Sequence, residues 1–60
     1  MYERIKSLAK EHRLTIRQVE EAAGLGKNTL WRWKTRSPMI DKVFRVANVL
    51  GVTVDELVRP

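Results

Sequence analysis

The sequence contains no cysteine, so neither a disulfide nor a thiolate metal site can form within it. Its single histidine, His12, cannot build a metal site without carboxylates beside it. No apolar run approaches the roughly 20 residues that a membrane-spanning helix needs, and the first residues do not resemble a signal peptide. We therefore expect a cytoplasmic protein with no metal site, no membrane association and no small-molecule cofactor.

Catalytic motifs are also missing. The sequence has no nucleophile–base pair, no carboxylate pair and no glycine loop of the kind that cradles phosphates. We therefore do not expect an enzyme. Hydrophobic residues make up 43% of the 60 residues, which is enough for a compact core but only for one domain. Residues 1–60 are expected to form a single domain.

Acidic residues are absent from one long internal window. The formal net charge is +5. Residues 22–40 contain no acidic residue, and their four basic residues are Lys27, Arg32, Lys34 and Arg36. Positive charge concentrated in this way attracts polyanions, of which the phosphate backbone of nucleic acids is the usual target. A solvated helix face explains the charge equally well, so the charge alone does not decide between the two.

Apolar residues recur with the period of a helix along the whole chain, and no stretch alternates in the manner of a strand. We expect an all-α fold of five helices, over residues 2–12, 16–23, 27–35 and 40–50 and around Leu57. Thr15 with Gln18, and Thr53 with Glu56, are typical of helix starts. Gly24 and Gly51 are expected to end helices, because glycine readily adopts the left-handed conformation.

The predicted core follows from the same periodicity. On the first helix the apolar stripe contains Tyr2, Ile5, Leu8 and Ala9, and His12 closes it as a packing residue. The later inward positions are Val19, Ala23, Leu25, Leu30, Trp33, Ile40, Val43, Phe44, Val46, Ala47, Leu50, Val52 and Leu57. The outer face of the third helix combines Lys27, Asn28, Trp31, Arg32 and Thr35, a mixture unusual for a merely solvated surface.

Two motifs in register resemble a known family. Residues 15–34, TIRQVEEAAGLGKNTLWRWK, resemble the helix-turn-helix of lambda-repressor-like (Cro/repressor, XRE) proteins. Downstream, Pro38 and the apolar stripe after it, followed by LGVTVDEL over residues 50–57, resemble the last two helices of that family. The resemblance covers essentially the whole chain and implies a compact five-helix domain with its helix-turn-helix at about residues 15–35.

The resemblance implies sequence-specific binding of double-stranded DNA, with the third helix in the major groove. Base contacts then fall on Lys27, Asn28, Thr29, Trp31 and Arg32, and phosphate contacts on Thr15, Arg17, Lys34, Thr35, Arg36 and Ser37. A phage or prophage-type repressor that reads operator DNA at the nucleoid of a bacterial or phage-infected cell fits this pattern. The alternative is a protein-binding module of the same fold, such as an antitoxin-like or anti-repressor partner.

Trp31 has two interpretations. On the outer face its indole can press on a thymine methyl, a sugar or a partner subunit. Alternatively, it folds back over Lys27 or Thr35 as a partly exposed surface residue. Trp33, in contrast, lies on the core face and is expected to be structural.

Three positions depart from the family pattern. Glu20 stands where the family often has alanine, so its long side chain is expected to lean out to solvent. Ile16 replaces a glutamine that holds a phosphate in many members, which leaves that contact to Thr15 or Arg17. Ala9 and Lys34 replace an arginine–glutamate pair, and since both partners are missing together, no buried charge is left unpaired.

Pairing of two copies is the last expectation. Proteins of this kind read two half-sites about one helical turn apart, ~34–36 Å. The apolar residues expected outside the core, Val49, Val54, Val58 and Trp31, are too few for a standard interface. We therefore expect a monomer that forms a weak homodimer on a palindromic operator, with contacts near the fourth and fifth helices.

Overall fold

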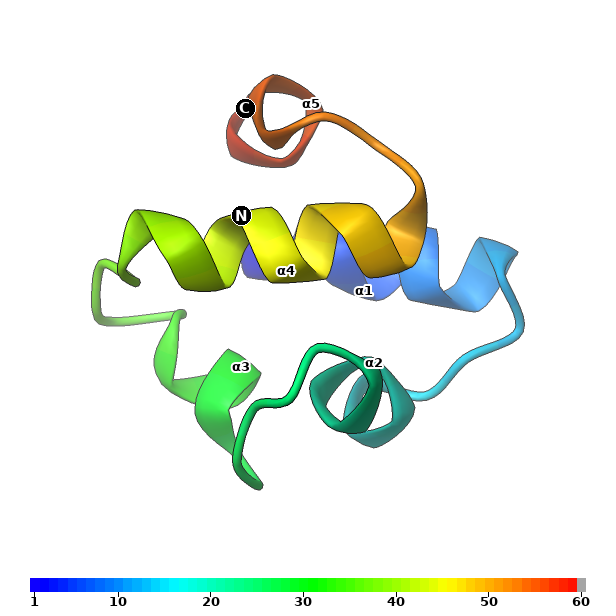
Figure 1. The fold of residues 1–60 in the computed structure, drawn as a ribbon, viewed down its shortest axis with the longest axis horizontal. Coiled ribbons are helices and arrows are strands. Elements are labelled where there is room, and N and C mark those ends of the chain that lie inside the picture. The colour runs from blue at the N-terminus through cyan, green and yellow to red at the C-terminus, as the bar shows by residue number, and fades with distance from the viewer. Residues whose placement is uncertain (60) are drawn as a thin grey trace.

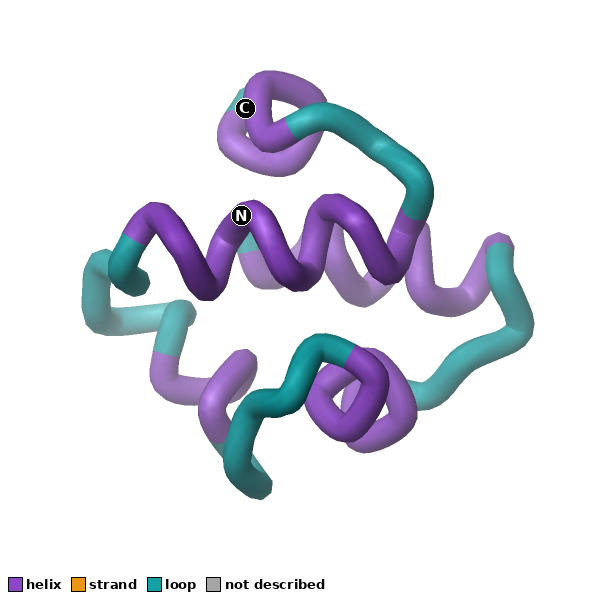
Figure 2. Tube along the Cα trace, viewed as in Figure 1, coloured by secondary structure: helices purple, strands orange, loops and turns teal. Residues whose placement is uncertain are grey.

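The computed structural model describes residues 1–59, and these contain five helices and no strand, as the sequence predicts. The helices are α1 (Tyr2–Glu11), α2 (Ile16–Ala22), α3 (Thr29–Arg32), α4 (Ile40–Leu50) and α5 (Val54–Val58). In Figures 1 and 2, α4 crosses the middle of the molecule and α1 passes behind it. The helices α2 and α3 lie together below α4, and α5 lies on the opposite side. None of the described helices is both long and apolar enough to cross a membrane.

The core lies between α4 and its neighbours, because α4 packs against both α2 and α5. Fully buried apolar side chains come from all five helices and are led by Ile5, Val19, Leu30, Val46, Leu50 and Leu57. Burying each such side chain stabilises the fold by about 1.5–3 kcal/mol. Leu25 and Trp33 are buried in the same cluster, as predicted, although Trp33 follows the last residue of α3 and does not lie within the helix.

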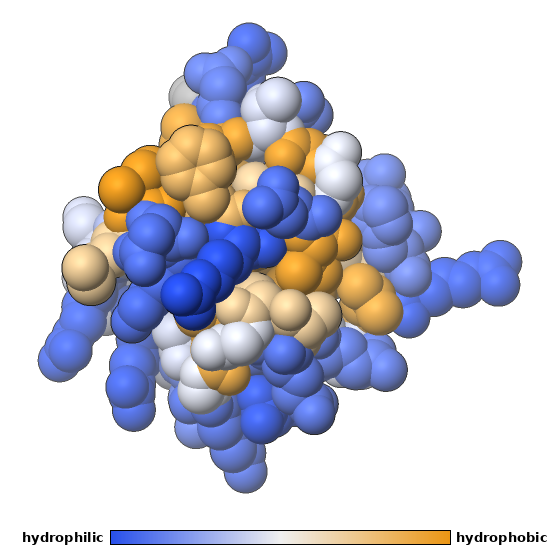
Figure 3. All heavy atoms as spheres, in the orientation of Figure 1, coloured by the Kyte–Doolittle hydropathy of each residue, from blue (hydrophilic) through white to orange (hydrophobic). Residues whose placement is uncertain are grey.

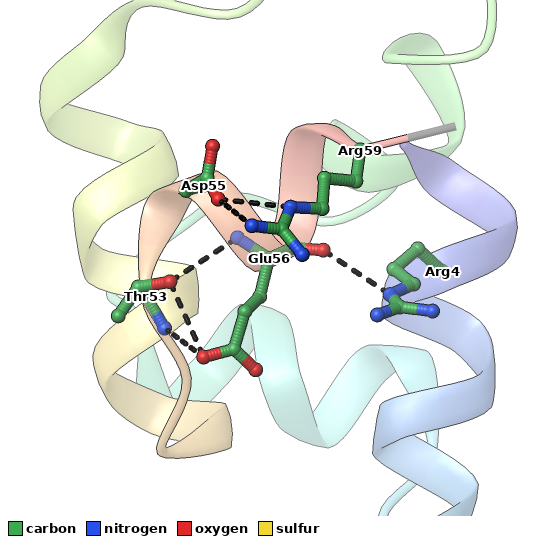
Figure 4. Close-up of polar contacts among 5 residues, drawn as sticks. All are labelled: Arg4, Thr53, Asp55, Glu56 and Arg59. Atoms are coloured by element: carbon green, nitrogen blue, oxygen red, sulfur yellow. Dashed lines mark hydrogen bonds and ion pairs between the residues drawn. The ribbon is translucent and has the colours of Figure 1, made fainter.

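Both predicted helix starts are confirmed as reciprocal capping boxes. The Thr15 hydroxyl accepts the N–H of Gln18 at 3.1 Å, and the Gln18 side chain accepts the N–H of Thr15 at 2.8 Å. Thr53 and Glu56 repeat this arrangement at the start of α5 (Figure 4). The same short helix is tied to α1, since Arg4 Nε donates to the carbonyl oxygen of Glu56 at 3.1 Å (Figure 4).

The end of α1 differs from the prediction. Gly24 (φ +73°) and Gly51 (φ +68°) end α2 and α4 in the left-handed conformation, as predicted. At the end of α1, however, a non-glycine residue, Arg13, takes that conformation with φ 58°. The chain reverses there and Leu14 N–H returns to the Ala9 carbonyl at 2.8 Å. The prediction that His12 packs in the core is therefore wrong, because α1 ends before it and its side chain is exposed.

The third helix is shorter than predicted at both ends. It begins at Thr29 instead of residue 27, because Asn28 has φ 66°, which a right-handed helix does not allow. Beyond Arg32 the amides of Lys34 and Thr35 bond to carbonyls three residues back, at 3.2 and 3.1 Å. Residues 33–35 thus form tight turns and carry the chain toward Pro38.

The buried face of α4 is narrower than predicted. Val43, Val46, Ala47 and Leu50 are buried, whereas Ile40 is 62% exposed and Phe44 is 56% exposed. At 3.6 residues per turn, Phe44 lies roughly 100° round the helix from Val43. The core placement of Ile40 and Phe44 is therefore wrong, because Phe44 lies beside the buried stripe and Ile40 lies at the first position of α4, before the first buried residue, Val43.

The two tryptophans differ enough in burial to test this core. Trp33 is 9% exposed and Trp31 is 58% exposed. We expect Trp33→Ala to lower the free energy of unfolding by ~3–5 kcal/mol, because it opens a cavity in the core. Trp31→Ala, the matched control, should lower it by less than about 1 kcal/mol. Urea denaturation measures both values, and a larger loss from Trp31→Ala would contradict the described packing.

Candidate nucleic-acid interface

The turn between α2 and α3 sets the direction of α3. After Gly24 reverses the chain, Leu25 enters the core and its N–H bonds to the carbonyl of Glu20 at 2.8 Å. The N–H of Thr29 then bonds to the carbonyl of Gly26 at 3.2 Å. These local bonds bring α3 against α2, so that both lie on one side of the molecule (Figure 1).

Lys27 and Asn28 lie in this turn immediately before α3, and both are exposed. Asn28 precedes the first helical residue, yet its side chain makes no capping hydrogen bond. The left-handed backbone at this position suits asparagine better than most residues. Its side-chain amide is therefore not used in capping α3 and is exposed to contact a ligand.

Thr29 is less accessible than the other predicted base-contacting residues. Its side chain is half-buried, and its hydroxyl donates to the carbonyl oxygen of Gly26 at 2.7 Å. The Thr29 hydroxyl therefore uses its proton to stabilise the turn before α3. Arg32, one turn further along α3, is exposed, and it borders two open depressions together with Arg36.

The basic residues of this segment are exposed and are not neutralised within the described part of the chain. Lys27, Arg32, Lys34 and Arg36 are all exposed. Over residues 1–59 the ion pairs join Arg17 to Glu20 and Arg59 to Asp55, and neither involves this group. In Figure 3 the lower edge of the molecule, over α2 and α3, is largely hydrophilic. A concentrated positive surface of this kind favours a polyanionic ligand.

The remaining predicted phosphate-contacting residues lie at the edges of the same region. Thr15 and Arg17 are exposed at the start of α2, and Thr35 and Ser37 are exposed in the segment that follows α3. The hydroxyl of Thr35 donates to the carbonyl of Arg32 at 3.4 Å, and the oxygen of Thr15 caps α2. Arg17 remains 47% exposed despite its contact with Glu20.

Trp31 contacts residues other than those that the sequence suggested. Its ring packs against the ring of Tyr2 in a T-shaped arrangement, with a centroid distance of 6.1 Å and an interplanar angle of 87°. The ammonium of Lys34 lies 3.8 Å from the centroid of the Trp31 ring and 5.2 Å from that of Tyr2. Trp31 therefore folds toward Tyr2 and Lys34 instead of Lys27 or Thr35, and it still exposes a large part of its indole.

Tyr2 is a residue of this surface that the sequence did not reveal. Helical periodicity places it on the core face of α1, and it is in fact half-buried. Its ring nevertheless reaches the outer side of α3 through Trp31 and Lys34. No local signal links the two segments, because their contact depends on how α1 and α3 pack.

The position of Glu20 also differs from the prediction. It does not lean out to solvent: the residue is 2% exposed, between α2 and α3. Its Oε2 accepts the N–H of Leu30 at 3.0 Å, and its Oε1 lies 3.5 Å from Nη1 of Arg17. These partners explain the burial, since a buried carboxylate is tolerated when it is hydrogen-bonded and paired. The sequence signal for this burial was Arg17, which lies three residues before Glu20 and can pair with it.

The comparisons with known proteins agree with this geometry. The model of the helix-turn-helix family matches residues 5–57, which include all of the residues from α2 to α4. Comparison of the chain with curated proteins and with solved structures found no match. Over the described residues, no three His, Asp or Glu side chains gather closely enough to hold a metal ion.

The left-handed backbone of Asn28 leads to a test that does not need DNA. Asn28→Gly should leave the free energy of unfolding unchanged or raise it slightly, because glycine adopts φ 66° without strain. Asn28→Ala should lower it by about 1 kcal/mol, because a Cβ without a polar group disfavours this conformation. Chemical denaturation of the two variants decides the point, and equal stabilities would contradict the described turn.

Proposed function

The chain belongs to the lambda-repressor-like (Cro/repressor, XRE) helix-turn-helix family, and from this premise we propose that it is the operator-reading part of a phage-type repressor. Members of the family are DNA-binding transcription regulators. In this proposal α3 enters the major groove of double-stranded DNA, and α2 lies across the sugar-phosphate backbone. The observation that carries the proposal is the exposed group of four basic side chains around α3, with no ion pair among the described residues.

Base reading is assigned to the two residues immediately before α3 and to three residues of α3 itself. Arg32 and Lys27 donate to the acceptor edge of guanine, and Asn28 pairs with adenine through its amide. Thr29 and Trp31 supply apolar contacts beside them, for instance to a thymine methyl. The exposed indole of Trp31 and the exposed amide of Asn28 are both available for these contacts.

Phosphate binding is assigned to the rim of the same surface. Thr15 and Arg17 at the start of α2 hold one side, and Lys34, Thr35, Arg36 and Ser37 after α3 hold the other. Such contacts fix the register of the protein on the duplex but do not read its sequence. Lys34 remains able to bind a phosphate, because an ammonium that faces an aromatic ring still has donors on its outer side.

A protein-binding module of the same fold is the second candidate. Such a module would be expected to present an apolar third helix to its partner. The exposed residues of α3 are Trp31 and Arg32, and the surface around them is basic. This composition favours DNA as the ligand.

Operator binding by two copies is the second part of the proposal. The exposed apolar residues differ from those expected, because Val49 and Val54 pack against the core. Met39, Ile40 and Phe44 at the start of α4 are exposed instead, whereas Val58 in α5 is exposed as expected. Apolar atoms accordingly gather over α4 and α5 in Figure 3. We propose that this small surface joins two copies weakly on a palindromic operator.

Selection of bound duplexes from random DNA tests the function directly. We expect an enriched half-site, repeated as a palindrome with centres about 34–36 Å apart. A promoter that carries the enriched site should then lose expression when the protein is present. Enrichment of no sequence, together with affinity that does not depend on salt, would contradict DNA reading and favour the protein-binding alternative.

Two arginines distinguish base reading from phosphate binding. Arg32→Ala should weaken binding to the selected site by ~1–3 kcal/mol and relax the preference at one base pair. Arg36→Ala should weaken binding to all duplexes alike and lower the slope of log K against log salt by about 1. Fluorescence anisotropy over a salt series measures both. Identical losses on every sequence would show that Arg32 does not read a base.

Phe44 tests the pairing of two copies. Because more than half of its side chain is exposed, Phe44→Ser should lower the melting temperature only slightly and leave the affinity for a single half-site unchanged. On the palindrome, the same variant should lose the cooperative gain that the wild type shows. Sedimentation of the free protein, and of its complexes with one and two half-sites, provides the measurement. A tight dimer without DNA, or equal affinity per site on single and paired half-sites, would contradict the proposal.

A further inference from the structure

Among residues 1–59, Glu20 is the charged residue whose side chain is buried, and its two carboxylate oxygens contact different partners. Oε2 accepts the backbone N–H of Leu30, which belongs to α3, at 3.0 Å. Oε1 lies 3.5 Å from the guanidinium of Arg17, which belongs to α2. One carboxylate therefore connects the backbone of α3 with an arginine on the surface of α2.

The contact with Leu30 replaces a cap that α3 does not have. Asn28 precedes α3 but its side chain accepts no backbone N–H of the helix, and the N–H of Thr29 bonds within the turn to the carbonyl of Gly26. The next amide, that of Leu30, is buried and receives its acceptor from Glu20. Within the described residues, this is the side-chain hydrogen bond that joins α2 to α3. The other side-chain hydrogen bonds either connect residues within one turn or involve residues of α5.

The contact with Arg17 has a different consequence. Arg17 lies on the rim of the proposed DNA surface and keeps 47% of its side chain exposed, whereas the Glu20 side chain keeps 3%. The carboxylate thus draws the guanidinium toward itself, but it also offsets the positive charge that a phosphate would meet. An arginine held in this way binds phosphate less strongly than one without a carboxylate beside it.

We propose that Glu20 is a positioning residue for DNA recognition, and this inference rests on the proposed DNA-binding function. Its accepting oxygen sets the placement of α3 relative to α2, on which the reading of bases depends. Its negative charge sets the direction and strength of the Arg17 phosphate contact, on which affinity for any duplex depends. Sequence preference and general affinity therefore respond to two different properties of the same side chain.

Two uncharged variants separate these properties. Glu20→Gln keeps an oxygen that accepts the Leu30 N–H, whereas Glu20→Leu fills a similar volume without any acceptor. Both release Arg17, so both should bind every duplex more tightly and show a steeper salt dependence. The ratio of affinities for selected and scrambled duplexes should stay within about twofold in Glu20→Gln and fall about tenfold in Glu20→Leu.

Two readouts exclude a merely structural role. Glu20→Leu leaves the buried N–H of Leu30 without its acceptor, which lowers stability, and the burial of the apolar side chain offsets part of this loss, so the variant should fold and yet lose selectivity. Hydrogen exchange of the Leu30 amide, measured against amides of α4, should accelerate in Glu20→Leu and stay slow in Glu20→Gln. Arg17→Ala is the control for the other oxygen, and it should lower affinity for all duplexes without altering Leu30 exchange or selectivity.

The outcomes distinguish this inference from the function on which it rests. A folded Glu20→Leu variant with unchanged selectivity and unchanged Leu30 exchange would overturn the positioning role alone. A wild-type protein that prefers no duplex would overturn the DNA-reading function, while the exchange data still show whether Glu20 holds α3. If Glu20→Leu does not fold, Glu20→Gln decides, because lost selectivity or lost Leu30 protection in that variant contradicts the proposal.

Discussion

Burial of one face of α4 is the interaction on which the rest of this small protein depends. The chain has no cysteine, so apolar packing has to hold it together. Val43, Val46, Ala47 and Leu50 present a continuous stripe, and α2 and α5 pack against α4. Because this stripe is narrow, α4 also leaves apolar side chains exposed at its start. The same helix thus organises the core and provides the surface proposed to join two copies.

The direction of each helix depends on short reversals of the chain. Arg13, Gly24, Asn28 and Gly51 all have positive φ, and each lies at or beside the end or start of a helix. Two are glycines, for which this backbone carries no steric cost, whereas the other two accept some strain. The reversals at Gly24 and Asn28 lie at the two ends of the turn that sets the direction of α3. They therefore determine where the polar residues before and within α3 lie relative to α2.

The candidate interface owes its charge to the placement of the few acidic residues. Glu20 is used inside the helix-turn-helix, and Asp55 pairs with Arg59 on α5, away from α3. The basic side chains around α3 consequently have no ion pair among the described residues, and Lys34 lies over aromatic rings instead of beside a carboxylate. A surface arranged in this way attracts a polyanion at long range and still offers varied groups for specific contacts.

Short-range signals in the sequence determined much of this protein. The capping residues Thr15 and Thr53, the helix-ending Gly24 and Gly51, and the basic window around α3 were all readable, because each depends on neighbours a few positions away. The sequence also placed Trp33 in the core. Only the tertiary structure decided that Glu20 is buried and that Phe44 is exposed. Helical periodicity states which residues share a face, whereas burial depends on which other helix covers that face, and this is settled by contacts between segments distant in the chain.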